Sequence, residues 1–177
     1  ALISRPKLLL LDEPLSNLDA KLREEMRFEI KEIQKRLGIT VVYVTHDQIE
    51  AMTMSDKIIL INKGVVQQIG TPEEIYRNPV NPFVANFVGR VNFIKGVAKD
   101  GFVELADTGK KLPYDGDKTG NVIVAIRPEA LRIDEKDGTI DAKLVSQFYL
   151  GDVNDCKVDL GNNNVVRVID HVETYGV

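Results

Sequence analysis

Three side chains that can do acid, base or metal chemistry follow two apolar segments of the sequence. Asp12 and Glu13 come directly after LLLL, residues 8–11, and His46 comes directly after VVYVT, residues 41–45. In a parallel α/β sheet, ligands bind at the carboxyl ends of the strands, and neighbouring strands lie roughly 5 Å apart. If the two segments are neighbours, two carboxylates and an imidazole meet at one edge. One carboxylate can hold Mg²⁺ through water, the other can orient or deprotonate a nucleophilic water, and the histidine can contact a phosphate. Side chains with these three roles are those that nucleotide hydrolysis requires.

The same residue types also occur in these positions for structural reasons. An Asp-Glu pair after a strand is a common turn, and a histidine after a strand is commonly a surface or capping residue. The three residues taken alone leave both interpretations open.

The segments around these residues alternate between strand and helix patterns. The expected elements are buried strands at 7–11 and 39–45, helices at 19–37 and 47–53, a hairpin of strands 57–62 and 65–69, and a helix starting at Thr71. Helix 19–37 has apolar residues at three- and four-residue spacing, and Gly38 follows as a left-handed stop. Thr71, Pro72 and Glu74 have the pattern of a capping box. Buried strands that alternate with amphipathic helices indicate an α/β layer with parallel strands.

After Gly89 the pattern changes to short strands separated by frequent turns. The expected strands are 93–98, 102–105, 122–126, 140–145, 156–160 and 165–169. This spacing is typical of an all-β barrel or sandwich. Residues 81–89 link the two halves through a short apolar helix. The predicted fold class is therefore α/β followed by all-β, with domains at 1–88 and 89–177.

The composition of the chain limits the classes of function. The net charge of the 177 residues is −4, so there is no overall basic field to attract nucleic acid, and no nucleic-acid partner is expected. The apolar runs are too short to span a membrane, and the start lacks a signal peptide. Cys156 is the single cysteine and is expected to be a small buried residue, His171 a surface residue, and Met52 and Met54 apolar filler.

Several motifs resemble one known family in order and spacing. LLLLDEP at residues 8–14, SNLD at 16–19, THD around His46 and GTPEEIYRNPVNPFVANFVG at 70–89 are similar to the ATP-binding subunit of an ABC transporter. The last of these resembles the importer subfamily that includes the maltose, polyamine and ferric-iron ATPases. AIRPEAL at 125–131 and YLGDVNDCKVDLG at 149–161 resemble its appended TOBE domain, an oligomer-binding-type β fold.

The resemblance implies a role for each matching residue, with ATP and Mg²⁺ as cofactors. Asp12 belongs to the Mg²⁺ shell through water, Glu13 is the general base for the attacking water, and His46 links Glu13 to the γ-phosphate. The D-loop residues cross the interface of a homodimer that holds two ATP molecules, and they are Ser16, Asn17, Leu18 and Asp19.

The resemblance also implies a fold, partners and a location. The fold is the C-terminal part of a P-loop NTPase parallel sheet followed by an OB-like TOBE barrel. The partners are a second ATPase subunit, transmembrane permease subunits and, indirectly, an extracytoplasmic solute-binding protein. The location is peripheral, at the cytoplasmic face of a bacterial membrane. The sequence of the segment SNLDAKLR favours a sugar as the solute, followed by ferric iron or a polyamine.

The sequence departs from the family at its phosphate-binding motifs. It contains no Walker A loop of the form GxxxxGK[ST], no LSGGQ signature and no Q-loop. The start, ALISRPKLLLL, resembles the family just after the signature helix, and HVETYGV resembles an early stop in the β domain. We therefore expect a C-terminal fragment with an incomplete TOBE domain, which does not hydrolyse ATP although its parent protein does.

Two other classes of function fit parts of the sequence. A non-catalytic regulatory or ligand-sensing module would act through residues 89–177 without nucleotide. A DNA-repair type ATPase shares the Walker B and D-loop chemistry, but AIRPEAL counts against it.

The basic side chains of the second half raise one further possibility. A paired-arginine anion pocket would use Arg127 and Arg132 around Pro128, with Arg90 and Arg167 nearby. The alternative is scattered surface arginines that pair with Glu129 and Asp134. Oligonucleotide binding would need exposed aromatic side chains in a basic groove, for which the candidates are Tyr114, Phe148 and Tyr149.

Overall fold

The computed structural model describes residues 6–106, 108–134 and 137–172. It divides into two compact units, Ala1–Gly89 and Arg90–Val177. The expectations for the two ends of the chain and for the turn residues Asp107, Glu135 and Lys136 lie outside the described residues.

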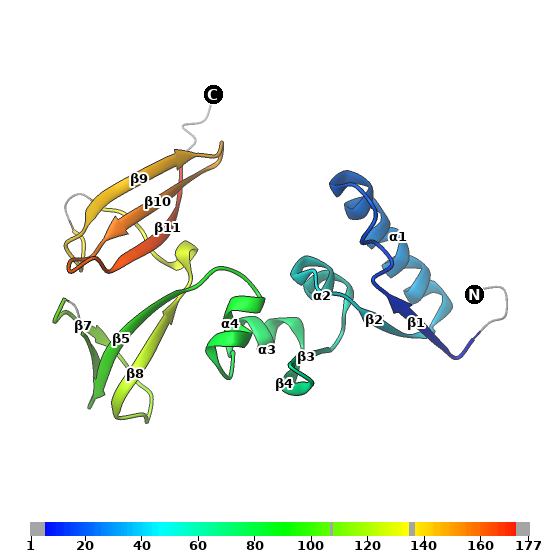
Figure 1. Ribbon diagram of the computed structural model, residues 1–177, viewed down its shortest axis with the longest axis horizontal. Coiled ribbons are helices and arrows are strands. Elements are labelled where there is room, and N and C mark those ends of the chain that lie inside the picture. Colours follow the sequence, from blue (N-terminus) through cyan, green and yellow to red (C-terminus); the bar gives the residue numbers. More distant parts are fainter. Residues whose placement is uncertain (1–5, 107, 135–136, 173–177) are drawn as a thin grey trace. The chain divides into compact units, whose positions relative to one another are not determined.

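The first unit begins with two parallel strands joined by a helix (Figure 1). Strands β1 (Leu8–Asp12) and β2 (Thr40–Val44) pair from Leu8 opposite Thr40 to Asp12 opposite Val44, which confirms that the two apolar segments are neighbours. Helix α1 (Ala20–Leu37) starts where the Asp19 side chain accepts a hydrogen bond from the Leu22 amide. It ends at Gly38 with φ 62°, the left-handed stop that the sequence predicts.

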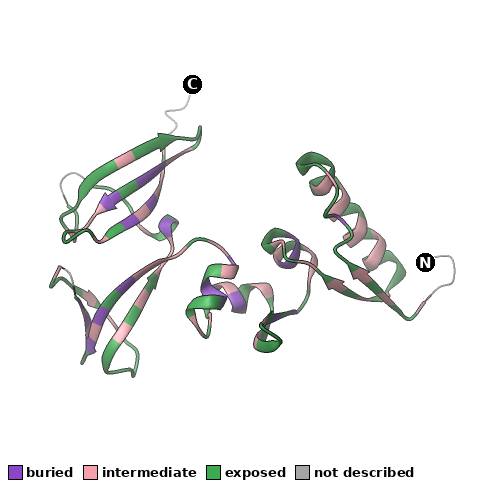
Figure 2. Ribbon diagram, in the orientation of Figure 1, coloured by how far each residue is buried: buried purple, intermediate pink, exposed green. Residues whose placement is uncertain are grey.

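The β1–β2 sheet is covered on one face only, so the prediction of fully buried strands is wrong for the described residues. Both strands contain only half-buried and exposed residues, which alternate along each strand (Figure 2). The exposed residues include Leu8, Leu10, Val42 and Val44. The opposite face is half-buried, as are Met26, Ile30 and Ile33 along α1. The physical reason is that a strand is buried on both faces only when a layer of structure covers each face of its sheet. A single helix provides one such layer.

The rest of the first unit is a hairpin packed with short helices. It consists of α2 (Gln48–Met54), β3 (Ile58–Asn62), β4 (Val65–Gly70), α3 (Pro72–Arg77) and α4 (Pro82–Phe87). The hairpin turns at Lys63 and Gly64, with φ 49° and 76°, as predicted. Thr71 and Glu74 form the predicted capping box of α3. The small core contains Ala51, Ile58, Leu60, Ile75, Val84 and Val88, against which Met52 packs.

The second unit contains two antiparallel sheets. The first has the order β7-β6-β5-β8 and the second β11-β10-β9. The strands are β5 (Asn92–Lys99), β6 (Phe102–Leu105), β7 (Lys111–Pro113), β8 (Gly120–Ile126), β9 (Lys143–Tyr149), β10 (Val153–Asp159) and β11 (Val165–His171), with a 3-10 turn at Pro128–Ala130. Strand β7 was not among the expected strands, and β9 starts three residues later than expected.

The core of this unit lies between the two sheets. Buried side chains come from both, among them Ile94 and Leu105 from one sheet and Cys156 and Val168 from the other. Within the described residues no ladder joins the sheets into a closed cylinder, so the OB-like barrel prediction is wrong in this respect. Instead, the Asn92 side chain bridges them: it accepts from the Arg167 amide at 2.8 Å and donates to the Arg167 carbonyl at 2.7 Å.

Candidate functional site

The carboxyl ends of β1 and β2 bring an acid and a histidine together. Asp12 ends β1 opposite Val44, and the Glu13 amide donates to the Val44 carbonyl at 2.9 Å. Nδ1 of His46 lies 2.8 Å from Oε1 of Glu13. Both side chains keep access to solvent, with exposed fractions of 78% for His46 and 46% for Glu13. The pair therefore forms at the edge where a ligand can reach it.

The contact with Glu13 changes the protonation of His46. The hydrogen bond to Glu13, followed by the charge of the same carboxylate, raises the pKa of His46 above its ordinary value of 6.5. A carboxylate accepts a hydrogen bond from the Nδ1–H group, so the imidazole keeps its Nδ1 hydrogen in either charge state. The raised pKa favours the imidazolium, in which Nε2 is also a donor and can bind an anionic oxygen.

Asp12 lies beside this pair with its carboxylate open to solvent. It is exposed and has no hydrogen-bond or ion-pair partner among the described residues. No three His, Cys, Asp or Glu side chains converge on one point in the described part of the chain. Magnesium commonly binds one or two carboxylates together with waters and substrate phosphates, so a single free carboxylate fits that ion.

The loop after β1 is a tight turn held by its own side chains. Glu13 has φ 43°, a left-handed conformation that is uncommon for a residue other than glycine. The Ser16 hydroxyl donates to the Glu13 carbonyl at 3.0 Å, and buried Leu15 accepts from the Leu18 amide through its carbonyl. Asp19 uses its carboxylate to cap α1. Of the four predicted D-loop residues, only Ser16 lines the pocket beside Glu13 and His46; Asn17, Leu18 and Asp19 do not.

A pocket of about 80 Å³ surrounds the pair. Sequence reasoning named three of its lining residues and missed four, and the seven are Glu13, Ser16, Arg23, Thr45, His46, Asp47 and Glu50. Asp47 could have been found as the N-cap of the predicted helix 47–53. Glu50 could have been found as an acid on the helix directly after the histidine. The sequence does not indicate that Arg23 belongs to the site, because Arg23 is one of many charged residues on α1.

Arg23 ties the two loops of the site together. Its guanidinium donates to the Leu18 carbonyl at 3.0 Å and pairs with the Asp47 carboxylate at 3.5 Å. The other Asp47 oxygen accepts from the Ile49 and Glu50 amides at the start of α2. The loop after β1 and the turn after β2 are therefore held by one side chain from α1.

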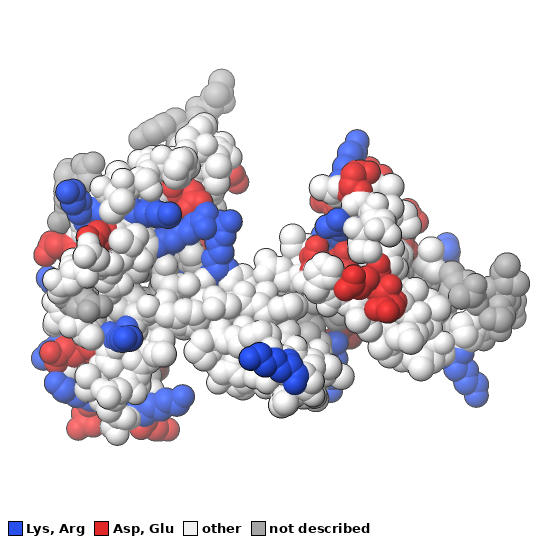
Figure 3. All heavy atoms as spheres, in the orientation of Figure 1, with Lys and Arg blue, Asp and Glu red and all other residues white. Residues whose placement is uncertain are grey.

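Charged side chains are distributed differently in the two units. On the face shown in Figure 3, acidic side chains gather where α1 and α2 lie, and basic side chains gather over β10 and β11. Asp155 pairs with Arg167 through two hydrogen bonds and lies 3.8 Å from Arg90. Arg127 donates to the Arg90 carbonyl. Of the arginines that could form an anion pocket, Arg167 therefore has its charge paired with Asp155, as in the alternative of arginines that pair with acids.

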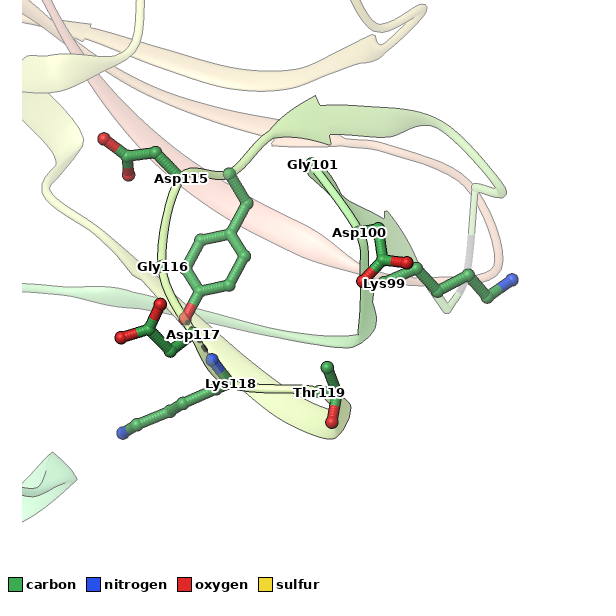
Figure 4. A pocket seen from close by; sticks show the side chains of 9 residues that line it. Lys99, Asp100, Gly101, Asp115, Gly116, Asp117, Lys118 and Thr119 are labelled. Atoms are coloured by element: carbon green, nitrogen blue, oxygen red, sulfur yellow. Dashed lines mark hydrogen bonds between the residues drawn. The ribbon is translucent and has the colours of Figure 1, made fainter.

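The second unit also has an open depression of about 430 Å³ at one end of its larger sheet (Figure 4). It is lined by the turn Lys99–Gly101 and by residues 114–119. The Tyr114 hydroxyl accepts from the Lys118 amide across it at 3.4 Å. Both acidic and basic side chains surround this depression, so its charge selects no class of ligand. Of the other residues singled out, Cys156 is buried and His171 exposed, as predicted, and Phe148 and Tyr149 are exposed.

No helix in the described ranges combines the length and the apolar character needed to cross a membrane.

Comparison with known proteins finds a family match for part of the second unit. Residues 124–175 match the TOBE domain family. This match runs from the end of β8 through β11 and includes the AIRPEAL motif.

The whole chain resembles one class of protein. It is 46% identical, over 97% of its length, to the spermidine/putrescine import ATP-binding protein of Clostridium acetobutylicum. It is 46% identical over 81% to the sn-glycerol-3-phosphate import ATP-binding protein of Vibrio vulnificus, and 48% identical over 85% to the Fe(3+) ions import ATP-binding protein of Fusobacterium nucleatum. The chain covers 50%, 40% and 42% of these three proteins, about half of their length or less. The chain is thus a homologue of the ATP-binding subunits of ABC importers and contains a segment that matches the TOBE domain family.

Proposed function

We propose that residues 6–89 supply the hydrolytic edge of an ATP-binding subunit that drives an ABC importer. The observation that carries the proposal is the 2.8 Å contact between Glu13 and His46 at the ends of two parallel strands. In this proposal Glu13 accepts a proton from the attacking water, and the Nε2 hydrogen of His46 binds the γ-phosphate. The raised pKa of His46 supports its role as a donor to an anion.

Asp12 is the residue that would hold Mg²⁺, through a water molecule. Its exposed carboxylate, which has no partner among the described residues, supports this role. When bound, the ion would neutralise charge on the phosphates of ATP. Asp12 would then position that charge next to Glu13, its neighbour in the chain.

The loop Ser16–Asp19 would face a second subunit. Asn17 is fully available for such a contact because it is exposed, whereas Asp19 is engaged as the cap of α1. In this proposal two subunits enclose ATP between them, bind transmembrane permease subunits at the cytoplasmic face of the membrane, and act indirectly on a solute-binding protein.

The 177 residues by themselves are proposed not to hydrolyse ATP. They contain no GxxxxGK[ST] segment, whose backbone amides and lysine provide most of the phosphate contacts in P-loop enzymes. The exposed apolar face of β1 and β2, which a second layer could cover, supports the same proposal. Binding of a fluorescent ATP analogue to this chain with micromolar affinity would contradict it.

The solute is proposed to be chosen by other subunits. Relatives named for a polyamine, a phosphate ester and a metal ion are 46% to 48% identical to the chain, so the degree of identity does not separate these chemically different solutes. The preference for a sugar stays a prediction.

A chimera tests the proposed chemistry. The chain would replace the matching half of the Clostridium acetobutylicum relative, and Mg²⁺-dependent ATP hydrolysis would be measured. Glu13→Gln and His46→Ala should each lower kcat about 100-fold or more, the usual loss when a general base or its partner is removed. Glu25→Gln, on the exposed side of α1, is the matched control and should leave the rate unchanged.

Two results would overturn the proposal. One is a Glu13→Gln chimera that retains full ATP hydrolysis. The other is an inactive parent chimera whose second unit binds a small molecule without nucleotide, which would favour the regulatory alternative.

A further inference from the structure

The pocket around the histidine of the site is also lined by a buried acid. Glu50, in the first turn of α2, is only 3% exposed, although acidic side chains are rarely buried without partners. It lines the same pocket as Glu13 and His46. Its burial calls for a physical explanation, which the surrounding hydrogen bonds supply.

Two hydroxyl groups from β2 and its end donate to one oxygen of Glu50. The Thr45 hydroxyl lies 2.7 Å and the Tyr43 hydroxyl 3.1 Å from Oε2. Burial, and then the nearby charge of Glu50, raises the pKa of Tyr43, so the phenol keeps the proton that it donates. The carboxylate is therefore satisfied by hydroxyl donors rather than by a cation.

Thr45 passes this contact on to the backbone around His46. Its hydroxyl donates to Glu50 and, at the same time, accepts from the Asp47 amide at 3.0 Å. Thr45 and Asp47 are the two residues on either side of His46. The chain of bonds from Glu50 through Thr45 to the Asp47 amide thus spans the turn that carries the imidazole.

We propose that Glu50 is a positioning residue, which fixes the turn at His46 through Thr45 and so aims Nδ1 of the imidazole at Glu13. This inference deepens the proposed function, since it gives the Glu13–His46 pair a third residue that touches neither ATP nor the reacting water. In this proposal the hydrogen bonds of Glu50, and not its charge, position the turn at His46. The groups that face the ring are Glu13 from the loop after β1, Asp47 from the N-cap of α2 and Glu50 from α2 itself, while Arg23 from α1 pairs with Asp47.

The geometry allows bonding and charge to be separated by substitution. Both hydroxyls donate to the same oxygen, and an amide carbonyl can also accept two hydrogen bonds. Glu50→Gln should therefore keep both bonds while it removes the charge. Thr45→Val removes the bridging hydroxyl and keeps the charge, and Thr45→Ser keeps the hydroxyl.

The readout is the imidazole ring, observed by NMR in the 177-residue chain without nucleotide. His46 and His171 are the two histidines of the sequence, and His171 in the second unit serves as an internal reference. In the wild type, ring ¹⁵N shifts should show a proton held on Nδ1 of His46, and its pKa should lie above 6.5. Thr45→Val should abolish the preference for the Nδ1 proton and lower the His46 pKa toward 6.5. Glu50→Gln and Thr45→Ser should retain the preference.

Two outcomes overturn the inference. If folded Thr45→Val keeps the Nδ1 proton, Glu50 is a core residue without influence on His46. If Glu50→Gln changes the ring as much as Thr45→Val does, the charge is responsible and not the hydrogen bonds. Neither outcome depends on ATP hydrolysis, so the failure of this inference differs from the failure of the proposed function.

A measurement on the wild type covers the case in which Thr45→Val does not fold. Hydrogen exchange of the Asp47 amide is measured at low urea concentrations. The ¹⁵N shifts of the His46 ring are recorded under the same conditions. They should change together. Loss of protection at Asp47 while the Nδ1 proton persists contradicts the inference.

Discussion

Glu13 combines a left-handed backbone conformation with a side chain that contacts the histidine of the site. Its backbone adopts φ 43°, which costs a side-chain-bearing residue roughly 1–2 kcal/mol, and its side chain contacts His46. A glycine would adopt this backbone without strain but has no carboxylate. The strain is consistent with a residue kept for its chemistry rather than for the stability of the turn.

Removal of the Glu13 charge should change the pH dependence of stability. The pKa of His46 is raised in the folded chain, so the pair stabilises the fold fully below the unfolded value of 6.5. That contribution is lost as the pH rises through the raised pKa. The Tm difference between wild type and Glu13→Gln should therefore be largest between about pH 5 and 6.5, where the carboxylate and the imidazole are both charged. Thermal melts across this range test it, and a difference that grows above pH 7 would contradict it.

The pairing of elements decides which side chains can meet. The parallel register of β1 and β2 places Asp12 opposite Val44, and the site follows directly at both strand ends. A shift of one residue would turn every side chain of one strand to the other face. In the second unit Asn92 plays a comparable part, because its amide joins the start of β5 to the middle of β11.

Loss of the Asn92 bridge should weaken the second unit. Asn92→Ala leaves the half-buried Arg167 amide and carbonyl without their side-chain partner, which costs about 1–3 kcal/mol of unfolding free energy. Asn121→Ala, at an exposed position on β8, is the control and should cost far less. Urea denaturation followed by circular dichroism compares the two. Equal losses would mean that Asn92 does not bridge the sheets in solution.

At the scale of the whole molecule, the first unit presents an uncovered apolar sheet face. Leu8 and Leu10 are 56% and 65% exposed, and Val42 and Val44 lie beside them on β2. Contiguous exposed apolar surface of this kind usually marks a contact with further protein. It agrees with relatives about twice as long as this chain.

This face should make the chain associate with itself at high concentration. Leu10→Thr should reduce that association, because it removes an exposed apolar side chain at little cost to folding. Light scattering over a concentration series measures the effect. Ile123→Thr, at a position 56% exposed in the second unit, is the control, and an equal reduction there would argue against this face.

The sequence by itself predicted most of the helices and strands and the residues whose side chains can do acid, base or metal chemistry. Local signals, such as the Gly38 stop, the Thr71 capping box and the Lys63-Gly64 turn, act over a few residues and can be read directly. Asp12, Glu13 and His46 were predicted to lie together because residues that follow parallel strands share one edge. The match of motifs extended this prediction to the class of protein.

Only the tertiary structure decided what surrounds those residues. Arg23, Thr45 and Glu50 come to the site through packing between α1, β2 and α2, and their hydrogen-bond partners lie 2 to 24 residues away in the chain. The same holds for the open sandwich in place of a barrel and for the single covered face of β1 and β2. Periodicity shows which side chains are apolar, but burial depends on which layers are present to cover them.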